Sequence, residues 1–196
     1  MLENYTQDSM FSMERLSTNP YAIRRLNPNV KSDAVPFQVD DTIVKNLTGT
    51  TLANLFTSGR LFYVDYSDQA QFVPITGRYA AACSALFYID PKTSNFLPLA
   101  VKTNVGADLV YTPLDEPTDW LLAKIMFNLN DAWFTPWYHF SSTHYVSGLA
   151  LQAAIRCMAP EHPVLAILQR SEFRLISYGL TDQDSKSPSF CFPTSC

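Results

Sequence analysis

The three histidines of this chain are the residues best suited to binding a metal ion, and they lie close together in the sequence. His139, His144 and His162 fall within 24 residues of a 196-residue chain. Histidines with separate structural roles would not be expected to gather in this way, and neutral imidazole is a common ligand of iron, manganese, copper and zinc. We interpret the cluster as a metal site or the remainder of one. The alternative is three imidazoles that serve only as core or surface groups.

The spacing of the first two histidines limits the kind of metal site. His139 and His144 are five residues apart, which on a regular α-helix separates their side chains by about 140°. Zinc helices of the HExxH type use a spacing of four and a glutamate, whereas Phe140 follows His139 here. The pair can meet one ion only where the helix is distorted, as in a π-bulge, and such bulges are frequent at functional sites. The spacing therefore argues against a zinc protease site and predicts a distorted helix around the metal.

A longer motif surrounds the histidines between residues 119 and 163. Besides the histidines it contains Trp120, Leu122, Ala123, Lys124, Asp131, Thr143, Arg156 and Pro163. These residues and their spacing closely resemble the lipoxygenases, the non-haem metal dioxygenases of polyunsaturated fatty acids. The segment NVGADLVYTPLDEP, followed by DWLLAK, is most similar to the corresponding sequence of fungal lipoxygenases, which include manganese as well as iron enzymes.

The resemblance implies roles for these residues. His139 and His144 would be the first two ligands of one iron or manganese ion, and His162 would not ligate. The implied substrate is a polyunsaturated fatty acid such as linoleate, from which the oxidised metal centre abstracts a pentadiene hydrogen before O₂ adds to give a hydroperoxide. No other cofactor is expected. Family members bring a third histidine, usually an asparagine, and the C-terminal carboxylate from further downstream, and no histidine follows His162 here.

The sequence also departs from the lipoxygenase pattern. Ser147-Gly148 stands where the family usually has Glu-Pro, and Pro136 precedes His139 in a stretch that is one residue shorter than in plant members. Asp131, Asp119 and solvent are the candidates to complete the metal shell, although the resemblance assigns none of them to it. Two hypotheses follow: a lipoxygenase, or a truncated, catalytically inactive lipoxygenase-like fragment or interaction protein. We expect this chain alone not to oxygenate linoleate at a lipoxygenase rate.

Composition and charge exclude some partners. The chain has 47% hydrophobic residues, enough for a core, and a net charge of −4 without a basic block, so nucleic acid is not an expected partner. The N-terminus shows no apolar signal-peptide region, and nowhere are there 18 continuous apolar residues, so neither a secretory signal nor a transmembrane segment is predicted. The cytoplasm is the default location, although some relatives are secreted.

The predicted fold class is mainly α with a small antiparallel β element, the N-terminal part of a lipoxygenase-like helical catalytic domain. We expect helices at 8–18, after residue 40, at 119–129 and at 145–159, and the start of a further helix at 164–168. Gly49 should interrupt the helical pattern after residue 40, and Gly59 should end it. The expected β-strands are 60–65, 84–90 and 96–103, the last two joined as a hairpin. The helix at 119–129 is apolar on nearly every side, which predicts that it is buried. Lys124 is its only cation and must find a partner or reach solvent.

The chain is expected to divide near residue 170. Residues 1–170 would form the partial lipoxygenase-like catalytic domain, and residues 171–196, which are rich in Ser, Asp and Pro, would form a divergent, disordered tail. A disulfide between Cys191 and Cys196 would close a short loop in that tail, and the sequence leaves it open.

Overall fold

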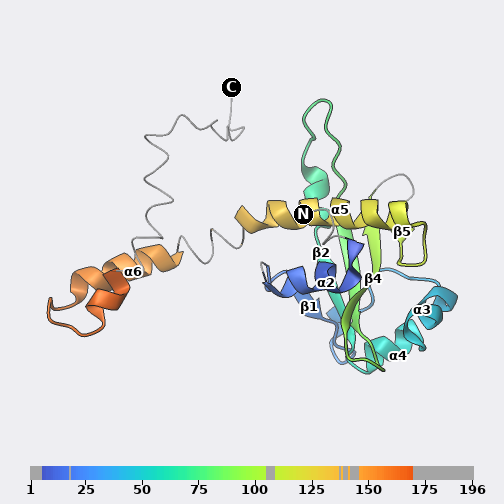
Figure 1. Cartoon of the computed structure of the whole chain (residues 1–196), viewed down its shortest axis with the longest axis horizontal. Helices are drawn as coiled ribbons and strands as arrows, with labels where there is room; N and C mark the ends of the chain where they lie inside the picture. The colour runs from blue at the N-terminus through green and yellow to red at the C-terminus, as the bar shows by residue number, and fades with distance from the viewer. Residues whose placement is uncertain are drawn as a thin grey trace. The chain divides into compact units, whose positions relative to one another are not determined.

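The computed structural model describes residues 6–17, 19–104, 109–136, 138, 141 and 146–169. The chain forms two compact units, Met1–His139 and Phe140–Cys196, which are described separately. The first holds a sheet with its covering helices, and the second is helical in its described residues (Figure 1). The predicted tail, with Cys191 and Cys196, lies outside the described residues.

The first unit is built on a five-stranded antiparallel sheet in which every strand pairs with its neighbour in sequence, in the order β1-β2-β3-β4-β5. The strands are β1 (Ile23–Arg25), β2 (Leu61–Asp65), β3 (Cys83–Ile89), β4 (Phe96–Thr103) and β5 (Val110–Tyr111). The predicted strands and the β3–β4 hairpin are confirmed, with Cys83 paired to Thr103 and Ile89 to Phe96. The sheet is wider than predicted, because β1 and β5 add a short edge strand on either side.

Helices cover both faces of this sheet (Figure 1). On one face, α2 (Asp8–Ser17) and α5 (Pro117–Phe134) pack on side chains from β2, β3 and β4. On the other, α3 (Asp41–Thr48) and α4 (Leu52–Thr57) pack on the alternate side chains of the same strands, together with Leu26, Phe37 and Val39. Each face thus has its own hydrophobic core, and the predicted fold class, mainly helical with a small antiparallel sheet, is confirmed.

A β-bulge in β4 allows both faces to be filled. Phe96 and Val101 contribute to the α2/α5 core although they are five residues apart, whereas Leu99 and Ala100 both contribute to the α3/α4 core. In a regular strand neighbouring side chains alternate between the faces. The pairing with β3 shifts register between Leu86 and Phe87, and this bulge resets the alternation halfway along β4.

Local capping explains the helices after residue 40. The Asp40 carboxylate accepts a hydrogen bond from the Thr42 amide at 2.7 Å and begins α3. Gly49 ends α3 in the left-handed conformation with φ of 73°, which separates it from α4 where the sequence predicted an interruption.

Helix α2, on the other side of the sheet, buries only part of the apolar side that its sequence predicts, which is Met10, Phe11, Met13 and Leu16. Phe11 is fully buried as expected, but Met10, Met13 and Leu16 are 44%, 53% and 49% exposed. The buried face of α2 also carries Arg15, because the Asp131 carboxylate on α5 makes burial of the arginine favourable.

The second unit contains α6 (Val146–Cys157), which confirms the helix predicted at 145–159. A further short helical turn covers residues 165–169, in the region expected to begin another helix. Between them, the Val164 amide donates to Nδ1 of His162 at 3.2 Å. None of the described residues belongs to a helix long and apolar enough to cross a lipid bilayer.

Candidate metal centre

Helix α5 is the element that leads to the predicted metal ligands. Glu116 is its N-cap and Pro117 its first residue, so the helix begins two residues before the predicted start at residue 119. Proline is well suited to the first position because its missing N–H would have no helical partner there. The helix continues to Phe134, five residues beyond the predicted end.

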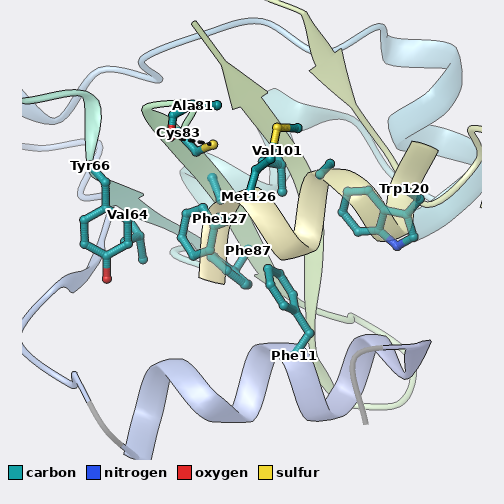
Figure 2. Close-up of a cluster of buried hydrophobic side chains, with 12 residues drawn as sticks. Phe11, Val64, Tyr66, Ala81, Cys83, Phe87, Val101, Trp120, Met126 and Phe127 are labelled. Atoms are coloured by element: carbon teal, nitrogen blue, oxygen red, sulfur yellow. Dashed lines mark hydrogen bonds between the residues drawn. The ribbon is translucent and has the colours of Figure 1, made fainter. Parts of the chain in front are cut away.

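The buried face of α5 is not wholly apolar. Trp120, Met126 and Phe127 enter the core (Figure 2), but Leu122 and Leu129 are 50% and 56% exposed. The prediction of a helix buried on nearly every side is therefore wrong for these positions.

Lys124 was predicted to need a partner, and in the structure that partner is Asp8 on α2. The Lys124 side chain is buried, and its Nζ lies 2.8 Å from Oδ1 of Asp8 and 3.3 Å from the carbonyl oxygen of Thr6. The same Asp8 oxygen accepts a hydrogen bond from Nε1 of Trp120 at 2.9 Å. A buried ammonium needs such compensation, and here the compensation ties the first half of α5 to α2.

The last turns of α5 are held by a second buried polar network, centred on Asp131. This aspartate is 6% exposed, its Oδ2 lies 3.2 Å from Nη2 of Arg15, and its Oδ1 accepts hydrogen bonds from the Tyr66 hydroxyl and, at 2.9 Å, from Nδ2 of Asn19. Asn19 also donates to the hydroxyl of Thr135 at 3.0 Å. The carboxylate thus joins α5 to α2, to the segment after α2 and to the end of β2.

Asn130 makes a matching set of contacts on the other side of α5. Its Oδ1 accepts from the Cys83 amide at 2.9 Å, and its Nδ2 donates to the carbonyl of Ala81 at 2.8 Å and to Oε1 of Gln69 at 2.9 Å. Gln69 in turn donates to the Asn130 carbonyl at 3.0 Å. All hydrogen-bonding atoms of the buried Asn130 side chain therefore have partners.

The chain changes its helical geometry directly after these anchors. Residues 135, 136 and 138 are π-helical, as is residue 141 in the second unit. The sequence predicted a π-type distortion in this region from the five-residue histidine spacing. His139 and His144 themselves lie outside the described residues, so their convergence on one ion remains a prediction.

The described residues supply no further ligand for such an ion. His162 is exposed and accepts a hydrogen bond within its own turn. Asp119 is exposed near the start of α5, about 18 Å along the helix axis from Asp131, and the Asp131 carboxylate is occupied by Arg15, Asn19 and Tyr66. Within the described part of the chain no cluster of three or more His, Cys, Asp or Glu could hold a metal. The donors remain the two imidazoles, which by themselves do not complete the shell of a non-haem metal centre.

Burial also changes the acidity of groups near the end of α5. The pKa of Tyr66 is raised above its ordinary value, first by burial and then by the negative charge of Asp131. Burial raises the pKa of the Cys83 thiol to about 12. At neutral pH both groups are protonated, and the tyrosine hydroxyl therefore acts as a hydrogen-bond donor to Asp131.

Comparison with known proteins connects this fold to one family. No family model matches the sequence. Over 170 residues, which cover 87% of the chain, it is 58% identical to a manganese lipoxygenase of Nakataea oryzae. Over 167 residues it is 59% identical to a manganese lipoxygenase of Fusarium oxysporum, with 85% of the chain covered. The sequence is homologous to the lipoxygenases.

A solved structure gives the same result for the fold. The structure of manganese lipoxygenase of Gaeumannomyces graminis matches 90% of this chain with a TM-score of 0.76 and 49% identity. The chain spans 27% of the length of each of the two curated relatives and 32% of that structure. The lipoxygenase resemblance and the predicted fold are thus confirmed, and the similarity concerns one part of those proteins.

Sequence reasoning missed the residues that anchor the end of α5. Asp131 was noted as part of the motif and as a candidate to complete the metal shell, but it is buried and its carboxylate is engaged by Arg15, Asn19 and Tyr66. Asn130 received no role. The available signal was the pair of polar residues in an otherwise apolar helical run, because buried polar groups in a core are usually hydrogen-bonded.

Proposed function

We propose that this chain supplies His139 and His144 as two ligands of a lipoxygenase metal centre that acts on polyunsaturated fatty acids. The observation that carries the proposal is the 58% identity over 87% of the chain. An alignment of that coverage necessarily includes the middle of the chain, where both histidines stand. Manganese is favoured over iron because the relatives that are more than half identical are named manganese lipoxygenases.

The part of this contribution that the described residues support is the anchoring of α5, the helix that precedes both histidines in the sequence. When bound, the metal would supply the redox chemistry for hydrogen abstraction from a fatty-acid pentadiene such as that of linoleate, and O₂ would add to the resulting radical. Within the described residues, α5 is fixed at both ends, by Lys124 to α2 and by Asn130 and Asp131 to the sheet and to α2. The remaining ligands must come from outside the described residues.

A second candidate, a lipoxygenase-like chain without activity of its own, is favoured by three observations. The chain corresponds to 27% of the length of the relatives, and two imidazoles are fewer ligands than a redox-active non-haem centre requires. Leu122 and Leu129 leave an apolar strip of α5 exposed, where other parts of a larger protein could pack.

Metal titration of the purified chain tests the histidine assignment. We expect added Mn²⁺ to lose the solution signal of the hydrated ion in electron paramagnetic resonance as it binds. His139→Ala and His144→Ala should each weaken binding at least about tenfold, because half of the protein ligands are lost. His162→Ala is the matched control and should bind as the parent does. Equal loss in all three variants, or none in the first two, would contradict the assignment.

Linoleate oxygenation separates the two candidates. With Fe²⁺ or Mn²⁺ present, we expect the chain not to form conjugated diene at a rate typical of a lipoxygenase. Metal-dependent diene formation that disappears in His144→Ala would establish the chain as a lipoxygenase without further ligands.

A further inference from the structure

The two adjacent residues Asn130 and Asp131 point in different directions from α5 and hold different parts of the fold. Asn130 is bonded to the residues that begin β3 and to Gln69. Asp131 is bonded to Arg15 and Asn19 on the other side. We propose that Asn130 and Asp131 form a clamp, a pair of positioning residues that fixes the C-terminal end of α5 and with it the start of the segment that continues to His139. The link to the metal rests on the function proposed above.

The burial of the clamp makes its geometry specific. Arg15, Asn19 and Tyr66 are 2%, 1% and 0% exposed, so their polar atoms cannot turn to solvent if Asp131 moves. Breaking a buried charge pair by removing one partner is strongly unfavourable, because the other charge is left uncompensated. The Asp131 carboxylate therefore has one low-energy position, set by two hydrogen-bond donors, Asn19 and Tyr66, and by its ion-pair partner Arg15.

The guanidinium of Arg15 is itself held in place. Its Nη1 donates to Oδ1 of Asn128 at 2.7 Å, and its Nη2 lies 2.9 Å from Oε2 of Glu14. The carbon at its centre lies 5.0 Å and 5.2 Å from the ring centroids of Phe11 and Phe127. Cation–π contacts and charged hydrogen bonds together orient it, so its positive charge is fixed beside Asp131.

The clamp acts where helical geometry changes. The carbonyl of Asp131 accepts hydrogen bonds from Nδ2 of Asn19 at 3.1 Å and from the hydroxyl of Thr135 at 3.0 Å. Thr135 is also bonded to Asn19 and is the first π-helical residue. The same carbonyl also accepts the regular helical hydrogen bond from the Thr135 amide. Three donors therefore meet at the Asp131 carbonyl, in the last turn before the helical geometry changes.

Hydrogen exchange of the intact chain, measured on peptides by mass spectrometry, tests the clamp without any metal. We expect Asp131→Asn to accelerate exchange of the amides at 132–138 at least about tenfold, because the local opening that exposes them becomes easier. Peptides from β3 and β4 should change much less. Tyr66→Phe removes one donor while keeping the ring and should give a smaller acceleration at the same amides.

Two controls separate positioning from general destabilisation. Asp119→Asn makes the same chemical change at an exposed position of the same helix and should leave exchange at 132–138 unchanged. Leu55→Ala removes a side chain from the α3/α4 core and so lowers global stability. It should leave the exchange rates of the amides at 132–138 within about twofold of those in the parent. Unchanged exchange in Asp131→Asn, or equal acceleration in β3 and β4, would overturn the clamp.

Mn²⁺ titration of the same variants tests the connection to the metal. Asp131→Asn should weaken Mn²⁺ binding at least about fivefold at a temperature where it is folded, whereas Leu55→Ala should not. Unchanged binding in Asp131→Asn would overturn the link between clamp and metal. A parent chain that binds no Mn²⁺ would overturn the proposed function, and exchange at 132–138 would still decide the clamp.

Discussion

Phe127 is the residue whose removal should damage the α2/α5 core most. Its side chain is fully buried, and its ring lies at the meeting point of three other rings, with centroid distances of 5.7 Å to Phe11, 5.3 Å to Tyr66 and 6.0 Å to Phe87 (Figure 2). The Arg15 guanidinium lies over the same ring. The position thus combines apolar burial with several aromatic contacts.

The expected magnitude follows from these contacts. Phe127→Ala should lower the free energy of unfolding by about 4 kcal/mol, within the ordinary range for a buried phenylalanine. Phe127→Leu keeps most of the volume but loses the ring contacts, each worth about 0.5–1 kcal/mol, and should lower it by about 2 kcal/mol. Because the alanine variant removes a large part of a typical domain's stability, the leucine variant provides the measurable intermediate.

Urea unfolding followed by far-ultraviolet circular dichroism measures both values. Leu122→Ala is the control, because Leu122 lies on the same helix and is 50% exposed, and it should change stability by less than about 1 kcal/mol. If Phe127→Ala falls within 1 kcal/mol of Leu122→Ala, the reasoning from the aromatic cluster is refuted.

Three further predictions concern acidity, backbone conformation and thiol reactivity. Burial raises the pKa of Cys83 from 9.0 and that of Tyr63 from 10.0, each to about 12. As pH rises, the unfolded chain therefore releases these protons before the folded chain does, so the stability that the two groups contribute is present below about pH 9 and is lost toward pH 12. Measuring the free energy of unfolding at a series of pH values would detect this loss. Gly49→Ala should destabilise the protein by about 1–2 kcal/mol, because φ at this position is +73°. Gly148→Ala lies within α6, where an added Cβ meets nothing within 4 Å, and it should raise helix stability by up to about 1 kcal/mol. Thermal melts in which both variants shift the melting temperature in the same direction would contradict this. In the native chain a thiol reagent should label exposed Cys157 quickly and buried Cys83 only on unfolding.

The parts of the fold that follow simple periodicity were predictable. The strands at 60–65, 84–90 and 96–103 are β-rich runs with turn residues between the last two, and Gly49 and Gly59 marked breaks that the structure has, both with positive φ. The short edge strands β1 and β5 were missed, because two or three residues are too few to show a period and their pairing is decided by the neighbouring strand.

Residues whose burial depends on a distant partner could not be placed from local pattern. Arg15 belongs to a helix whose methionines suggested the opposite face, and its burial follows from Asp131, more than a hundred residues later in the chain. Lys124 was an intermediate case: the need for a partner was predictable from an apolar helix, but Asp8 as that partner was not. The spacing of His139 and His144 predicted a helical distortion, and π-helical residues do occur beside them.

The bulge in β4 makes this strand tolerant of one particular change in length. It acts as a phase shift, because the residues before and after it count odd and even positions from different origins. Deleting Leu99 would restore regular alternation, and each remaining residue of β4 would keep its present partner on β3 and its present core. Deleting Leu97 instead would move Phe96 to the α3/α4 side, because the alternation outside the bulge is regular. For this strand, therefore, the position of a deletion decides whether the two cores keep their side chains.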